Sequence, residues 1–102
     1  MATMIVPSVT AIEAEAEASL FLSDRVPDRI SASTPCLDEA AQVWRVPVVL
    51  AYPFVGVLGQ VGEIVVSTTK AEVSSSTPIE EVLRAAESLA EQHRDAIEAN
   101  LP

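Results

Sequence analysis

Side chains that commonly carry chemistry are scarce in this chain of 102 residues, which contains one histidine and one cysteine. His93 has the chemistry of a general base or a metal ligand. However, no second histidine or cysteine stands at the spacing of a metal site. His93 follows Leu89 and Ala90 at helical spacing. We therefore expect it to pack at the edge of an apolar helix face, with one ring nitrogen in contact with water.

Cys36 stands beside acidic residues rather than basic ones. A nucleophilic cysteine needs positive charge nearby to stabilise its thiolate, whereas Asp38 and Glu39 follow Cys36 closely. We interpret Cys36 as a small, half-buried residue without a catalytic role. A single cysteine also excludes a disulfide bond within the chain.

Three glycines, Gly56, Gly59 and Gly62, have a spacing that invites comparison with phosphate-binding loops. No Lys-Ser or Lys-Thr pair follows them and no helix is expected directly after them, so the comparison fails. We attribute the glycines to the flexibility of a hairpin. The serine run before Thr77 indicates a turn and a helix cap. The acidic pair Glu80-Glu81 indicates the solvated start of a helix. We expect no catalytic residues, no metal site and no cofactor.

Charge and composition restrict the partners. The chain has six basic and fifteen acidic residues, which gives a net charge of −9. This charge disfavours binding to nucleic acid and to membrane surfaces. Hydrophobic residues make up 49% of the chain, enough for one domain over residues 1–102. The first ten residues lack the basic region of a signal peptide, and prolines and glycines interrupt the apolar run 46–61. We predict a cytoplasmic location.

The first helix is predicted to begin at Thr10, where Glu13 completes a capping box, and to end at 24–25. Residues 1–8 are predicted to form an N-terminal arm. Along the helix, Ile12, Ala16 and Leu20 lie on the apolar face, and Ala14, Ala18, Phe21 and Leu22 widen it. Residues 26–40 read as a loop, with a short helical turn at 37–41.

Period-two alternation predicts a strand over residues 43–52. Its core face carries Trp44, Val46, Val48, Leu50 and Tyr52, and its other face carries Val43, Arg45, Pro47, Val49 and Ala51. Pro47 cannot donate to a ladder, so we expect its nitrogen at an unpaired edge or a bulge. Residues 53–60 leave two alternatives open, a hairpin tip or a projecting apolar flap.

Two further strands and a last helix complete the predicted order. We expect strands at 61–68 and 72–75, and a final helix with Thr77 as N-cap and Glu80 completing its capping box, ending at Asn100 and Pro102. The fold class is α+β: a small antiparallel sheet of about three strands, flanked by an N-terminal and a C-terminal helix.

A sheet of this size leaves its second face and its edges unprotected. We therefore predict a homodimer or a complex with another protein. The candidate interface consists of six apolar residues of the central hairpin: Val49, Ala51, Phe54, Val55, Val57 and Leu58.

The segment Val66–Val73, VSTTKAEV, with Gly62-Glu63 before it, resembles the strand–turn–strand ending of PepSY-like domains. Trp44 stands in the earlier strand, where that family often has a tryptophan, and Glu72-Val73 match the final pair of its turn motif. PepSY-like modules are associated with inhibiting or regulating proteases. The resemblance therefore implies a binding function.

The chain departs from the PepSY-like motif at Ser67, where the family prefers aspartate, and at Ala71, where it prefers glycine. The turn type at 69–71 therefore stays open, because an alanine is strained at positive φ. The Trp–x–Val–Pro–Val run at 44–48 and the closing acidic helix also resemble small, uncharacterised bacterial α+β proteins, a likeness that implies no activity.

The function that these observations favour is a non-catalytic protein-binding or regulatory module. One alternative is a small enzyme or ligand-binding protein with a site at a dimer interface, which would need His93, Arg45 and Tyr52 around one pocket. A third alternative is an antitoxin-like neutralising partner, which the acidic charge permits.

Overall fold

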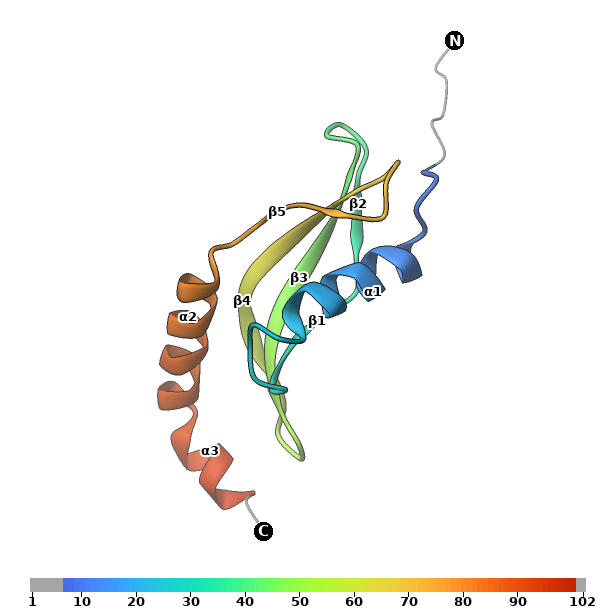
Figure 1. Cartoon of the computed structure of the whole chain (residues 1–102). Helices are drawn as coiled ribbons and strands as arrows, with labels where there is room; N and C mark the ends of the chain where they lie inside the picture. The colour runs from blue at the N-terminus through green and yellow to red at the C-terminus, as the bar shows by residue number, and fades with distance from the viewer. Residues whose placement is uncertain (1–6, 101–102) are drawn as a thin grey trace.

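Five antiparallel strands and three helices form the part of the chain that the computed structural model describes, residues 7–100 (Figure 1). In chain order they are α1 (Ala11–Leu22), β1 (Ile30–Ala32), β2 (Cys36–Asp38), β3 (Val43–Tyr52), β4 (Gly56–Ser67), β5 (Val73–Ser76), α2 (Ile79–Gln92) and α3 (Arg94–Ala99). The predicted α+β class with an antiparallel sheet is confirmed. The expected arm at 1–8 lies mostly outside the described residues.

The sheet is organised around the long β3–β4 hairpin. β5 pairs with β4, while β1 and β2 both pair with β3 along its other edge. The prediction of about three strands is wrong, because residues 26–40 supply two short strands instead of a loop with a helical turn at 37–41. β3 offers a free edge of ten residues, and pairing with it satisfies the backbone of the connecting segment.

Pro47 lies where the ladder along β3 is interrupted. β1 pairs with residues 48–50 and β2 with residues 43–45, so Pro47 falls between the two short strands. Its carbonyl oxygen accepts a hydrogen bond from the Ser33 amide at 2.8 Å. Because the nitrogen and oxygen of one residue point to the same side of an antiparallel strand, the proline nitrogen faces this gap, as the sequence predicted.

The start of α1 is confirmed, but only one part of its predicted apolar face is buried. Thr10 Oγ1 accepts from the Glu13 amide at 3.1 Å, and Glu13 Oε1 accepts from the Thr10 amide at 3.0 Å. Ala14, Ala18 and Leu22 are buried, whereas the exposed outer side of the helix carries Ile12 and Leu20. Apolar residues occur on both sides of α1. The side with the small alanines is buried, because they let the helix lie close to the sheet.

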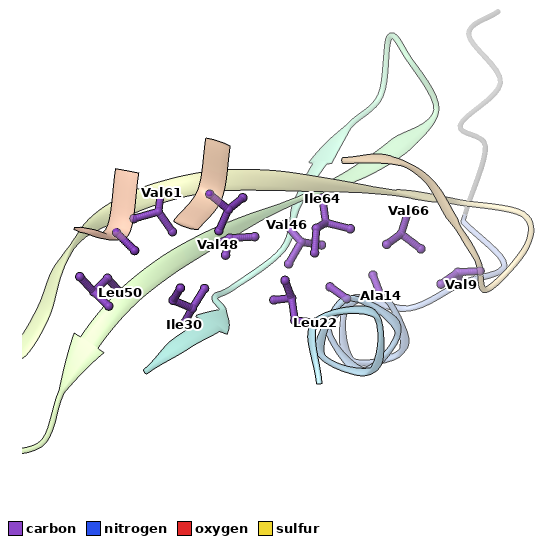
Figure 2. Packing of buried hydrophobic residues seen from close by; sticks show 13 residues of the cluster. Val9, Ala14, Leu22, Ile30, Val46, Val48, Leu50, Val61, Ile64 and Val66 are labelled. Carbon is purple, nitrogen blue, oxygen red and sulfur yellow. The ribbon is translucent and has the colours of Figure 1, made fainter. Parts of the chain in front are cut away.

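One face of the sheet carries the core (Figure 2). Val46, Val48 and Leu50 of β3 are buried there, as predicted, with Trp44 and Tyr52 partly buried against the same cluster. The Trp44 indole N–H donates to the carbonyl of Val9 at 2.8 Å. This bond fixes the segment before α1 to the sheet.

The end of the chain differs from the prediction in two ways. Thr77 does not cap α2: its Oγ1 accepts from the Glu63 amide, and its own amide donates to the Glu63 carbonyl, both at 2.9 Å. Thr77 therefore extends the β4–β5 ladder, and the helix starts after Pro78. The predicted single helix is also broken, because His93 has φ −111° and ψ 18° between α2 and α3.

Candidate binding surfaces

The residues considered for an active site are not brought together. His93 lies at the junction of α2 and α3, Arg45 near the start of β3, and Tyr52 at the end of β3 beneath the Arg29 guanidinium. The two cavities that Tyr52 lines contain neither His93 nor Arg45. The pocket that would favour a small enzyme is therefore not formed by these three residues.

Cys36 is exposed on β2, so the expectation of a half-buried thiol is wrong. It pairs with Arg45 across the two strands, which places both residues on the same face of the sheet. Over residues 7–100, no cluster of three histidine, cysteine or carboxylate side chains is arranged to hold a metal ion. No helix within the same range has the length and apolar character needed to cross a membrane.

No helix of residues 7–100 covers the face of the sheet opposite the core. The buried side chains of α1 and α2 all belong to one core cluster, so both helices pack on the same face. Strand pairing places six apolar residues on the other side, which we call the open face: Val43, Pro47, Val49, Ala51, Val57 and Val65. All are at least partly exposed, and Val57 retains 65% of its accessible surface.

An ion-pair cluster crosses this open face near the start of β3. Arg45 Nε lies 2.9 Å from Asp38 Oδ2, and one of its terminal nitrogens lies 2.9 Å from Glu63 Oε1. Hydrogen bonds from Arg45, and then from the Ala41 amide, hold the pKa of Asp38 below its ordinary value. The same two carboxylates raise the pKa of Arg45. The cluster links β2, β3 and β4 and carries one net negative charge.

The lowered pKa of Asp38 predicts a pH-dependent contribution to stability. A carboxyl group whose pKa is lower in the folded state stabilises the fold above its unfolded pKa, and this stabilisation is lost as pH falls through the folded value. At pH values below about 4, the melting temperature of the wild type should therefore decrease. In Asp38→Asn, melting temperatures above pH 5 should drop by a few degrees, and the acid-induced decrease should be smaller. Circular dichroism melts between pH 2 and 7 measure both effects.

The matched control is Glu39→Gln, because Glu39 is an exposed neighbouring acid outside the cluster. Its pH profile should follow that of the wild type. If both variants show the same flattened profile, then overall charge rather than the Arg45 pairing governs acid stability.

The structure divides the six predicted interface residues among three environments. Val49, Ala51 and Val57 lie on the open face. Phe54 and Val55 belong to the turn between β3 and β4, and Phe54 is 87% exposed with φ 67°. Leu58 packs against the core. Of the two alternatives for residues 53–60, the hairpin tip is correct, since Tyr52 pairs with Gly56 across the short turn.

A cavity of about 210 Å³ lies between this hairpin tip and α3. Its lining comes from the residue before β1, from the hairpin and from the last helix and the residue after it: Arg29, Tyr52, Pro53, Phe54, Val55, Ile97 and Asn100. Figure 1 shows the end of α3 near the tip of the hairpin. Sequence reasoning missed Arg29 and this use of Ile97. The only signal was that Ile97 stands seven residues after Ala90 and so continues the apolar helix face expected there.

Comparison with known proteins gives no assignment: no family model, no curated protein and no solved structure matches the chain.

Proposed function

We propose that the protein is a non-catalytic protein-binding module that associates with a second copy of itself through the open face. The observation that carries the proposal is the placement of both helices on one side of the sheet. The apolar residues Val49, Ala51 and Val57 then remain at least partly exposed, and no helix of residues 7–100 packs over them. The separation of His93, Arg45 and Tyr52 supports a binding role over catalysis.

The size of the open face sets the expected strength of association. A strand of ten residues is about 33 Å long, and three or four strands spaced about 4.8 Å apart span about 14–19 Å. Each partner would then bury about 500–600 Å², less than the roughly 800 Å² of a standard interface. We therefore expect a weak dimer. Since each copy has a net charge of −9, added salt should strengthen the dimer by screening repulsion.

Light scattering over a range of protein concentrations tests this proposal. The apparent mass should rise from the monomer value of 10.8 kDa toward twice that value at concentrations of about 100 μM. The double variant Val49→Glu, Val57→Glu should stay monomeric under the same conditions. It places four charges in a dimer interface from which water is excluded.

Ile12→Glu is the matched control, because Ile12 is 82% exposed on α1 and lies away from the open face. This variant should associate like the wild type at equal ionic strength. A wild-type protein that remains at 10.8 kDa up to about 500 μM and in high salt would exclude a dimer of even weak affinity.

The PepSY-like resemblance would assign the same class of role, with a protease as the partner. The connection between β4 and β5 is compatible with an alanine in place of glycine, because the positive φ values of non-glycine residues within 7–100 occur at Gln42 and Phe54. The identity of a heterologous partner stays a prediction.

A further inference from the structure

We propose that the cavity between the hairpin tip and α3 is a binding site for small hydrophobic monocarboxylates, with the carboxylate held by Arg29. This site is separate from the open face, because Tyr52 belongs to the core-facing side of β3. The inference therefore does not depend on self-association. The site combines an apolar cavity with the Arg29 cation at its wall.

Arg29 has no carboxylate partner among residues 7–100. Arg25, Arg45 and Arg94 each pair with a carboxylate, but within residues 7–100 no carboxylate lies at ion-pairing distance from Arg29. Arg84 on α2 also lacks such a pair within this range, but Arg29, unlike Arg84, lines the apolar cavity at the hairpin tip. The Arg29 guanidinium retains the full capacity for a charge-assisted, two-point contact with an external carboxylate.

Arg29 is also held in place. Its guanidinium carbon lies 4.7 Å from the centre of the Tyr52 ring, and its backbone carbonyl accepts from the Ala51 amide at 2.9 Å. Stacking on an aromatic face leaves the edge of the guanidinium, where its N–H donors point, free to bind. The side chain therefore loses less freedom when a ligand binds.

The apolar walls and the volume define the rest of the ligand. Phe54, Val55 and Ile97 surround the cavity together with the Tyr52 ring. Its volume of about 210 Å³ exceeds the roughly 150 Å³ of an engineered apolar cavity that binds benzene. The site has room for one phenyl ring or branched alkyl group, with the acid at the rim. Larger polyanions such as nucleotides would exceed this space and meet the acidic surface.

Titration with phenylacetate and its neutral analogue phenylacetamide, followed by 1H–15N NMR of the full chain, tests the proposal. Phenylacetate should shift the amides of residues 52, 54–56 and 97 with a dissociation constant of about 0.1–10 mM. Phenylacetamide should bind at least about tenfold more weakly, because it cannot form the charge-assisted pair. Equal affinities, or shifts confined to other residues, would overturn the proposal.

Two variants separate the parts of the site. Arg29→Gln should weaken phenylacetate binding by about tenfold and leave phenylacetamide unchanged, whereas Ile97→Ser should weaken both ligands equally. Arg25→Gln is the control, since Arg25 also stacks on an aromatic ring, at 4.2 Å from Phe21. It removes the same charge outside the cavity and should change nothing. A loss of phenylacetate binding in Arg25→Gln equal to that in Arg29→Gln would show a general charge effect and refute the site.

Discussion

Replacing Ile64 with alanine is expected to lower the free energy of unfolding by about 3–4 kcal/mol. Ile64 is 1% exposed and is the largest of the fully buried side chains. It lies in β4 opposite Val46, so its removal leaves a cavity that the neighbouring strand and helix cannot fill without moving. A domain of this size has a total stability of about 5–15 kcal/mol, so this one change should remove a large part of it.

The control is Val65→Ala, one position further along the same strand. Val65 points to the open face and is half-buried, so we expect a loss of about 1 kcal/mol or less. Urea unfolding followed by circular dichroism and Trp44 fluorescence, at dilute protein concentration, measures both values. Equal losses would mean that the two faces of β4 are exchanged, as a shift of one residue in register would produce.

Alternation of large aliphatic residues made the central strand predictable. Val46, Val48 and Leu50 repeat every second residue over a strand of ten, so the burial preference is repeated several times along one element. β1 and β2 have only three residues each, too few for any period to be recognised. Their structure follows from pairing with the free edge of β3, which is a property of the tertiary fold.

Local competition explains the misassigned positions at the two helices. Thr77 has the right spacing to Glu80 for a capping box, but its hydroxyl accepts from the Glu63 amide instead. That partner is distant in sequence and could not be anticipated. In α1, residues on both sides are apolar, and Ala14 and Ala18 are buried because the sheet approaches closely.

The candidate surfaces were foreseen only where they depend on a single hairpin. Val49, Ala51 and Val57 were predicted from the thinness of the sheet, and they do lie on the open face. The cavity at the hairpin tip needs Arg29, directly before β1, and Ile97 of α3 to converge from positions far apart in the sequence. That convergence depends on the break at His93, and neither glycine nor proline marks residues 92–94.

Gly62→Ala is expected to lower the free energy of unfolding by about 1–3 kcal/mol through overpacking. The φ of Gly62 is not in the left-handed region, so backbone freedom does not explain the glycine. The close approach of Val82 and Thr77 explains the glycine, because an added Cβ would lie 2.8 Å from Val82 Cγ2 and 3.2 Å from Thr77 Cβ. Val82 is 2% exposed, and its branched side chain has few alternative rotamers. We expect α2 to be displaced from β4.

Gly59→Ala supplies the matched control for this displacement. Its added Cβ would lie 3.1 Å from a terminal methyl of Leu89, which is a flexible, half-buried side chain that can rotate away. The strain should then roughly cancel the gain from replacing glycine within a strand, about 0.5–1 kcal/mol, and leave stability nearly unchanged. Urea unfolding of both variants measures the contrast.

A double-mutant cycle with Val82→Ala distinguishes the steric explanation from any other. If the clash with Val82 causes the loss, Gly62→Ala should cost less in the Val82→Ala background than in the wild type, a non-additivity of about 0.5–3 kcal/mol. The reason is that the added methyl group then occupies space that the truncated side chain has vacated. Strict additivity would mean that the clash with Val82 does not cause the loss of stability.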